Sequence, residues 1–199
     1  MSSIKIIGLS GTNGAGKDAA GHTLALKHNY LFVSVTDLLR EEAKRREISV
    51  DRENLRMISA EWRRQYGLGV LVDRAYDQFK QLEEEYTGLA ISSLRNPAEA
   101  DRVHELGGIV VWVDANPKTR YERIQANLAA RGRGTEDQKT YEQFLLEEEM
   151  EMHTPPGGDA ANLDMSGVKQ RSDLILLNDH TNLEQFETFI DDQLFGAQG

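Results

Sequence analysis

The sequence predicts an α/β protein in which a five-stranded parallel sheet carries helices on both faces and so forms three layers. Short apolar segments alternate along the chain with longer segments of helical periodicity. The clearest apolar segment, IVVWV at 109–113, lacks the polar alternation of a half-exposed strand, which indicates a strand covered on both faces. A glycine-rich turn also joins the first apolar segment to the first helical one.

Five apolar segments are expected to form the strands, at 4–7, 30–35, 89–93, 109–113 and 173–177. Helices are expected at 18–28, 38–47, 51–66, 70–85, 97–106, 117–130, 137–152 and 183–194. Capping and turn residues set several of these bounds. We expect Thr36 and Asp37 to cap the second helix, and Pro97 and Pro117 to begin two later ones, because proline fits the first turn of a helix.

Composition limits the classes of function. The 23 Lys and Arg residues against 33 Asp and Glu give a formal net charge of −10, so we expect no nucleic-acid partner. An anionic small molecule would have to be bound by a local cluster of basic side chains. The lack of cysteine excludes disulfides and thiolate metal sites. No segment approaches the length of a membrane span, so we expect no membrane partner and a cytoplasmic location.

The turn after the first predicted strand carries a phosphate-binding motif. GTNGAGK at 11–17 fits the first seven positions of the Walker A pattern GxxxxGK[ST], in which glycines let backbone N–H groups converge on an anion. Lys17 supplies a mobile charge that can follow the β- and γ-phosphates of ATP. The residues expected to bind the nucleotide are Gly11, Thr12, Asn13, Gly14, Ala15, Gly16, Lys17, Asp18 and Ala19. The alternative is a glycine-rich turn without a ligand.

The motif departs from the pattern at its last position, where Asp18 stands instead of Ser or Thr. A hydroxyl at that position normally holds Mg²⁺, so Asp18 is the candidate metal ligand, directly or through water. The end of the third predicted strand often supplies a carboxylate that supports the metal. Here it supplies Ser92 and Ser93.

Two arginines after strand ends are candidates for binding the phosphate of an acceptor. Arg40 lies one helical turn after Thr36, and its planar guanidinium suits a bidentate contact; the alternative is a solvated helix face. Arg95 follows the third predicted strand. The alternative for Arg95 is a structural ion pair with Glu99, four residues further on.

A glycine-broken segment between two predicted helices contains Arg131 and Arg133. It suggests a lid that brings positive charge to a transferring phosphoryl group and excludes water. Arg120 and Arg123 precede it, and for Arg123 we favour a role in solubility alone.

Asn178 follows the last predicted strand, a position that commonly contacts the nucleotide base; the alternative is a turn and a helix cap. The three glutamates at 147–149 are interpreted as a solvated helix face.

Over nearly its whole length the chain resembles the P-loop nucleotide kinases, which include adenylate kinases, dephospho-CoA kinases and phage deoxynucleoside monophosphate kinases. GTNGAGKD resembles the loop of the phage enzymes, where GKD replaces GKS or GKT, and SLRNPAEA at 93–100 is similar to another of their segments. TDLLR at 36–40 resembles the adenylate kinase segment whose arginine binds the acceptor phosphate. REEAKRR, PKTRYERI, RGR and LLND are similar to segments of an archaeal dephospho-CoA kinase-like family. The resemblance implies phosphate-binding roles for Lys17, Arg40, Arg95, Arg131 and Arg133, and a role at the base for Asn178.

We therefore expect an ATP- and Mg²⁺-dependent kinase that transfers the γ-phosphoryl group to a (deoxy)nucleoside monophosphate. Lys17, Arg131 and Arg133 would stabilise the transferring group. If the acceptor is instead a hydroxyl, as in dephospho-CoA, Asp37 is the candidate catalytic base. A third hypothesis is a nucleotide-binding regulatory protein with little turnover. The expected partner is a small-molecule nucleotide, and the chain is expected to be a monomer or a homodimer.

The 199 residues are expected to form a single domain with the three-layer P-loop NTPase fold. Its core is assigned to 1–50, 86–130 and 172–199. The helical insertions are an acceptor-binding region at 51–85 and a lid at 131–152. Residues 153–171 contain two prolines and two adjacent glycines without periodicity, and are predicted to be a mobile loop.

Overall fold

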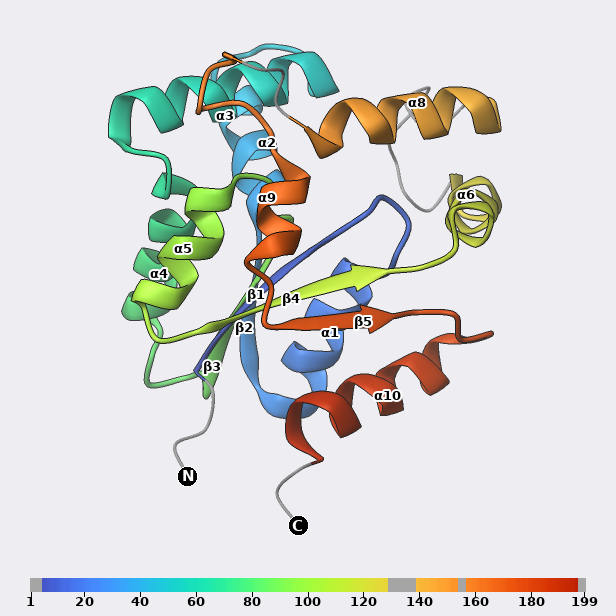
Figure 1. Cartoon of the computed structure of the whole chain (residues 1–199). Coiled ribbons are helices and arrows are strands. Elements are labelled where there is room, and N and C mark those ends of the chain that lie inside the picture. Colours follow the sequence, from blue (N-terminus) through green and yellow to red (C-terminus); the bar gives the residue numbers. More distant parts are fainter. Residues whose placement is uncertain (1–4, 129–138, 154–156, 197–199) are drawn as a thin grey trace.

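The computed structural model describes residues 5–128, 139–153 and 157–196. Five strands in this part of the chain form one parallel sheet in the order β2-β3-β1-β4-β5 (Figure 1). The strands are β1 (Ile6–Gly11), β2 (Tyr30–Ser34), β3 (Gly88–Ser92), β4 (Ile109–Asp114) and β5 (Leu174–Leu177). The predicted five-stranded parallel sheet is confirmed, and its central strand is the one that precedes the glycine-rich turn.

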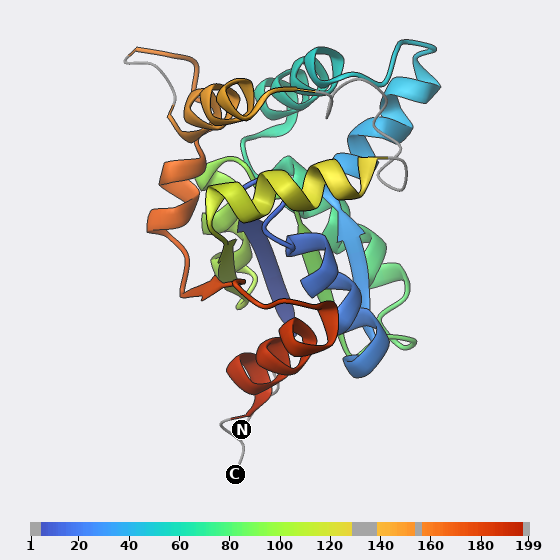
Figure 2. The same cartoon turned by 90° about the vertical axis from the view of Figure 1, so that its right-hand side faces the viewer.

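Helices cover both faces of the sheet and one of its ends. They are α1 (Lys17–His28), α2 (Val35–Arg45), α3 (Arg52–Tyr66), α4 (Val70–Gln81), α5 (Pro97–Glu105), α6 (Pro117–Ala126), α8 (Tyr141–Met152), α9 (Met165–Gln170) and α10 (Leu183–Phe195). Helices α1 and α10 cover one face, and α4, α5 and α9 cover the other (Figure 2). Helices α3 and α8 lie side by side beyond the carboxyl ends of the strands, where ligands bind in open α/β sheets. No helix within the described ranges is both long and apolar enough to cross a bilayer.

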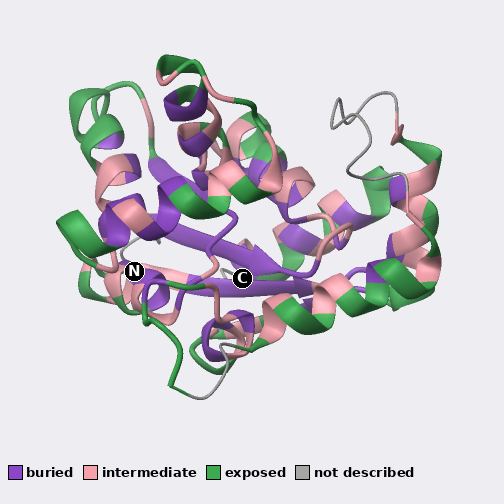
Figure 3. Ribbon diagram, turned by 90° about the horizontal axis from the view of Figure 1, so that it is seen from above, coloured by how far each residue is buried: buried purple, intermediate pink, exposed green. Residues whose placement is uncertain are grey.

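The three central strands, β3, β1 and β4, are buried almost throughout because their side chains alternate between two hydrophobic cores (Figure 3). Ile7 and Leu9 of β1 belong to the core under α1 and α10, whereas Ile6 belongs to the core under α4 and α5. Val111 and Val110 of β4 divide in the same way. The uninterrupted apolar run in β4 is thus explained by burial on both faces.

The N-terminus of α2 differs from its predicted form. The helix begins at Val35 with Ser34 as its N-cap residue, so Thr36 and Asp37 lie in the first turn instead of capping the helix. No side chain caps α2. An acidic side chain in the first turn still interacts favourably with the positive end of the helix dipole, and this is the place that Asp37 takes.

The prediction that 153–171 is a loop throughout is wrong for residues 165–170, which form α9. Met165 and Val168 of this helix are buried in the core of the sheet, and Asp164 caps it by accepting a hydrogen bond from the backbone N–H of Gly167 at 2.9 Å. A helix of six residues offers too short a window for periodicity to be recognised, and the preceding prolines and glycines favour a loop.

Two helical regions also differ in extent from the predicted ones. Residues 51–85, the predicted acceptor-binding region, form α3 and α4. Helix α4 packs against β3 and contributes Val72 and Phe79 to the core, so α3 is the part of this region that lies at the strand ends. Helix α8 begins at Tyr141 with Thr140 as its N-cap, and the predicted start at 137 lies outside the described residues.

A buried ion pair ties α3 to the turn between β3 and α5. The Oε1 atom of Glu99 accepts hydrogen bonds from the Nη2 and Nε atoms of Arg63 at 2.7 and 3.1 Å. Its Oε2 atom accepts from the backbone N–H groups of Arg95 and Asn96 at 2.7 and 3.1 Å. The side chains of Arg63 and Glu99 are 2% and 0% exposed, so each charge depends on its partner.

Replacing Arg63 with methionine is therefore expected to lower the free energy of unfolding by about 3–5 kcal/mol, because it leaves a buried carboxylate without its counter-charge. The neighbouring Arg64 also pairs with a carboxylate, that of Asp159, but its side chain is 57% exposed. The matched variant Arg64→Met is expected to cost about 1 kcal/mol or less. Urea denaturation followed by far-UV circular dichroism measures both, and equal losses would contradict the expectation.

Candidate functional site

The glycine-rich turn leads from the end of the central strand into α1. Gly11 and Gly16 have φ angles of 139° and 106°, a region that favours glycine. A Cβ on Gly11 would lie 1.9 Å from the carbonyl oxygen of Val113, and one on Gly16 would lie 2.6 Å from Nδ2 of Asn178. Gly16 is the N-cap residue of α1, and no side chain caps the helix. The positive end of the helix dipole therefore faces the turn, an arrangement that fits a phosphate group.

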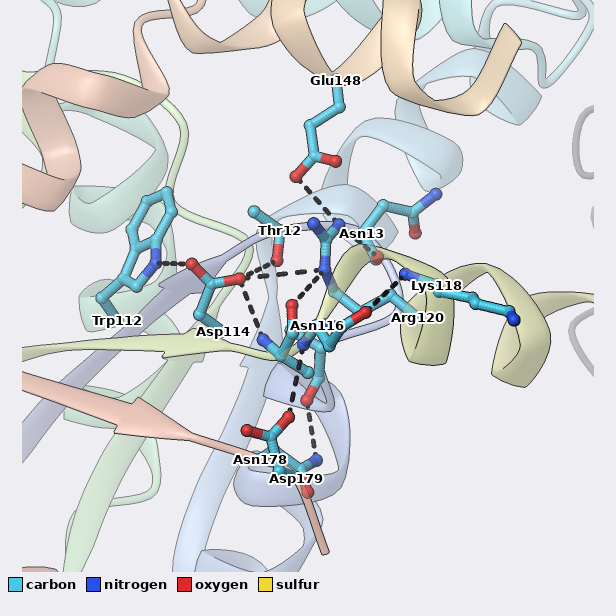
Figure 4. A network of polar contacts seen from close by, with 12 residues as sticks. Thr12, Asn13, Trp112, Asp114, Asn116, Lys118, Arg120, Glu148, Asn178 and Asp179 are labelled. Atoms are coloured by element: carbon cyan, nitrogen blue, oxygen red, sulfur yellow. Dashed lines mark hydrogen bonds and ion pairs between the residues drawn. The ribbon is translucent and has the colours of Figure 1, made fainter. Parts of the chain in front are cut away.

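Polar contacts from β4 and α6 hold the first half of the turn (Figure 4). Asp114, at the end of β4, accepts hydrogen bonds from Oγ1 of Thr12 at 2.8 Å and from Nε1 of Trp112 at 3.3 Å. The buried guanidinium of Arg120 donates to the carbonyl oxygens of Ala115 and Asn13 at 2.8 and 3.3 Å. Burial opposes ionisation of Asp114, but these hydrogen bonds and the nearby Arg120 outweigh it and lower the pKa of this carboxyl. These contacts connect the turn to the end of β4 and to α6.

Contacts from the β5–α10 connection hold the second half of the turn. The buried side chain of Asn178 donates from Nδ2 to the carbonyl oxygen of Ala15 at 2.8 Å. Nη2 of Arg123 donates to the carbonyl oxygens of Asn178 and His180 at 3.0 and 2.9 Å, so solubility alone does not account for this arginine. Among the described residues, its buried Nη1 has no hydrogen-bond partner. Contact between Asn178 and a base stays a prediction.

A carboxylate and a hydroxyl meet where α1 approaches the end of β3. Oγ of Ser92 donates a hydrogen bond to Oδ1 of Asp18, and Ser92 is fully buried. In P-loop NTPases the hydroxyl comes from the loop and the carboxylate from another segment. In this chain the loop supplies the carboxylate, Asp18, and the strand end supplies the hydroxyl, Ser92. Within the described ranges no group of three or more His, Cys, Asp or Glu side chains could hold a metal. Asp18 and Ser92 fit Mg²⁺, which commonly takes one or two protein oxygens and completes its shell with phosphate and water.

A cavity lies between the turn, α2, α3 and the β3–α5 connection. Lys17, which is 8% exposed, lines this cavity. Five arginines line it too: Arg40, Arg52, Arg56, Arg63 and Arg95. The sequence predictions placed Lys17, Arg40 and Arg95 at one site, and the structure brings all three to the wall of this cavity.

The local contacts of the two predicted acceptor arginines differ. Nη1 of Arg40 donates to Oδ1 of Asp37 at 2.6 Å. Asp37 is exposed and does not line the cavity, so its role as a catalytic base stays a prediction. The alternative ion pair between Arg95 and Glu99 is wrong, because Glu99 binds the backbone N–H of Arg95 and the guanidinium of Arg63 instead. The side chain of Arg95 is thereby left to face the cavity.

Helix α8 directs carboxylates toward the basic residues of the site. Glu147 pairs with Arg52 at 2.9 Å and also with Lys139, and Glu148 pairs with Arg120 at 2.8 Å. The interpretation of residues 147–149 as a solvated face is wrong for Glu148, whose side chain is 18% exposed and pairs with the buried Arg120. Glu149 is exposed, and 41% of the Glu147 side chain is exposed although it is paired. A second cavity lies between the paired carboxylates and the glycine-rich turn.

Several site residues were missed by the sequence predictions. Arg52 and Arg56 are spaced four residues apart on α3, so their shared helix face was a signal in the sequence. Asp114 and Glu151 offered no such signal, because their partners are distant in the chain. The predicted lid arginines Arg131 and Arg133 lie outside the described residues, and α8 is the described part of the predicted lid.

Comparison with known proteins connects this geometry to a family. The sequence profile of the AAA domain matches residues 7–151. A UPF0200 protein from Pyrococcus abyssi is 28% identical over 178 residues, covering 87% of each chain. A UPF0200 protein from Pyrobaculum aerophilum is 26% identical over 186 residues, covering 92% of this chain and 93% of its own.

Two solved structures share the fold. Shikimate kinase from Acinetobacter baumannii, in complex with shikimate, has a TM-score of 0.55 and 13% identity, covering 99% of this chain and 96% of its own. Shikimate kinase from Bacteroides thetaiotaomicron has a TM-score of 0.56 and 15% identity, covering 96% of this chain and 99% of its own. At these identities the likeness concerns the fold.

Proposed function

Because this chain belongs to the AAA domain family and has the fold of the P-loop kinases, we propose that it transfers the γ-phosphoryl group of ATP to a (deoxy)nucleoside monophosphate. One observation carries the proposal: Lys17 of the phosphate-binding turn lines the same cavity as Arg40 and Arg95. A phosphate donor and an anionic acceptor would thus meet in one cavity. Transfer between phosphates needs positioning and charge neutralisation, and no strong base, because the attacking oxygen is ionised at neutral pH.

Different residues of the chain would bind the phosphate donor and the acceptor. Glycine-built backbone N–H groups and Lys17 would hold the ATP phosphates. Asp18 and Ser92 would hold Mg²⁺, which neutralises charge on the phosphates when bound. Six basic side chains around one cavity, in a chain with a net charge of −10, favour a small acceptor of high negative charge.

A nucleotide-binding regulator with little turnover is the second candidate. It is favoured by the α8 carboxylates, which already pair with Arg95, Arg52 and Arg120. A hydroxyl kinase is less well supported, since Asp37 lies outside the cavity wall.

ADP formation measured with a panel of (deoxy)nucleoside monophosphates and dephospho-CoA separates the candidates. A nucleotide kinase is expected to release ADP only when a suitable monophosphate is present. Stimulation by dephospho-CoA alone, with activity lost in Asp37→Asn, would replace the proposal with a hydroxyl kinase. ATP binding without acceptor-stimulated ADP release would leave the regulatory protein as the remaining candidate.

Arg95→Ala is expected to raise the KM for the acceptor by about 10- to 100-fold, because a hydrogen bond to a charged group contributes about 1.5–3 kcal/mol. The dissociation constant of ATP is expected to change less than this KM, since the glycines of the turn and Lys17 are proposed to hold the ATP phosphates. Arg102→Ala provides the matched control: Arg102 lies on α5 and pairs with Asp73 and Glu105, away from the cavity. Steady-state kinetics measures both variants, and an unchanged KM in Arg95→Ala would remove this arginine from the acceptor site.

A further inference from the structure

Three arginines converge on the carboxylate of Glu151. Nη1 of Arg95 lies 2.8 Å from Oε2, and Nη2 of Arg56 lies 2.8 Å from Oε1. Nη1 of Arg52 lies 3.6 Å from Oε1. The Glu151 side chain is 14% exposed, whereas those of the three arginines are 28%, 46% and 27% exposed, in the order given. Two elements that are distant in the chain, α3 and the β3–α5 connection, thus build one site around this carboxylate.

This cluster has the charge of an anion-binding site. Besides Glu151 it includes the carboxylate of Glu147, which pairs with Arg52 at 2.9 Å and also with Lys139. Burial opposes ionisation of Glu151, but the charges of Arg95, Arg52 and Arg56 outweigh it and lower the pKa of this carboxyl to about 2. Two negative charges do not balance the three arginines and Lys139. A phosphate monoester carries up to two charges and more acceptor oxygens than a carboxylate, so it matches three guanidinium groups better.

Glu151 also lies between the two cavities of the site. Together with Arg52 and Arg95 it lines the cavity over the glycine-rich turn and the cavity that contains Lys17, Arg40 and Arg56. Any ligand group bound to all three arginines would occupy the position of the Glu151 carboxylate. Such a ligand and Glu151 exclude each other.

Glu151 can leave its partners without freeing helix α8 from the fold. Phe144 of this helix is buried, Met152 packs against the core under α4 and α5, and Glu148 pairs with the buried Arg120. The ion pairs between α8 and α3 have partly exposed partners and cost little to break. Displacement of the Glu151 side chain therefore leaves the sheet and its two cores intact.

We propose that Arg52, Arg56 and Arg95 form the subsite for the acceptor's phosphate, and that the carboxylate of Glu151 fills this subsite until the acceptor displaces it. This inference rests on the proposed function, because it takes the acceptor to be a phosphate monoester. It adds two arginines of α3 to the acceptor site and gives α8 the role of an internal competitor. The apparent affinity for acceptor is then the intrinsic affinity reduced by the stability of the Glu151 contacts.

Inorganic phosphate is the probe, titrated calorimetrically into the full-length protein saturated with ADP. Glu151→Gln keeps the shape of the side chain and removes its charge, so phosphate is expected to bind about 5-fold more tightly or better. Glu149→Gln removes a charge from an exposed position of the same helix and is expected to change the affinity less than 2-fold, since the position makes no contact with the subsite. Unchanged or weaker binding in Glu151→Gln would overturn the proposal.

The bound phosphate is located by a second substitution. Arg56 lines the acceptor cavity but not the cavity over the glycine-rich turn. Arg56→Gln added to Glu151→Gln is expected to abolish the gain in affinity. A gain that survives this change would place the phosphate at the turn and contradict the subsite.

Hydrogen exchange of the unmodified protein provides a readout that needs no variant. Saturating phosphate is expected to speed exchange of the α8 amides, because Glu151 loses its partners. Slower exchange in α8 on binding would contradict displacement. The two proposals fail separately: phosphate binding as described without ADP formation would remove the kinase and keep the subsite. Acceptor-stimulated ADP formation with unchanged phosphate affinity in Glu151→Gln would support the kinase and remove the subsite.

Discussion

Asp18→Asn is expected to lower the rate of ADP formation by about 10²–10³-fold, the loss typical for removing one group that stabilises transition-state charge. Asp18 carries the charge of the Asp18–Ser92 pair, and asparagine would still accept the hydrogen bond from Ser92. The fold should therefore persist while Mg²⁺ binding weakens. Titrating Mg²⁺ into the ATP-bound protein, alongside the rate measurement, distinguishes a metal defect from loss of nucleotide binding.

The reciprocal exchange Asp18→Ser with Ser92→Asp makes the test sharper. It restores the usual arrangement, with a hydroxyl on the loop and a carboxylate at the strand end. The double variant is expected to recover at least about 10-fold of the activity lost in Asp18→Ser alone, as expected for two residues that act as one unit. Ser92→Asp alone serves as the control, since it places two carboxylates together and should not raise activity. A double variant no better than Asp18→Ser would show that the contact between the two side chains has no role in metal binding.

Lys17→Met is expected to reduce ADP formation by about 10³-fold or more, the range seen when a cation that neutralises a transferring phosphoryl group is lost. It should also weaken ATP binding by about 10- to 100-fold, because a hydrogen bond to a charged group is lost. Methionine has a similar length and fits the largely buried position, and the midpoint of thermal unfolding is measured alongside to separate a lost charge from a lost fold.

Lys27→Met is the matched control for this variant. Lys27 lies at the other end of α1 and pairs with Asp191 at 3.0 Å, far from the glycine-rich turn. It is expected to leave ATP binding and ADP formation within about 2-fold of the unmodified protein. Unaltered ATP affinity in Lys17→Met would mean that the turn does not bind the triphosphate, and the kinase proposal would lose its basis.

The helix α8 shows why the candidate site was predicted only in part. Charge runs on a helix usually face water, and the sequence between 147 and 149 carries no sign of the opposite. Glu147 and Glu148 instead form ion pairs with arginines of α3 and α6, and those partners are about 30 to 95 residues away in the chain. Pairing at such separation is decided by how the elements pack, and periodicity along one helix does not contain it.

Arg95 and Asn178 also show that position along the chain does not determine which partner a side chain contacts. The sequence left Arg95 with two alternatives, of which the ion pair with Glu99 rested on their spacing along a helix. The structure rejects that pair because α3 brings Arg63 to Glu99. Asn178 was placed correctly at a strand end, but its amide binds the carbonyl of Ala15 and so supports the phosphate-binding turn.

What the sequence determined by itself was the set of local features: apolar runs that become buried strands, caps and prolines that begin helices, and the glycines of the turn that precedes Lys17. Each of these depends on the conformational preferences of neighbouring residues, so it can be read within a short window. What only the tertiary structure decided was which charges meet: Asp18 with Ser92, Arg63 with Glu99, and Glu151 with the three arginines. Those contacts depend on where distant elements lie, and electrostatic attraction acts between side chains only after the sheet and its cores have brought them together.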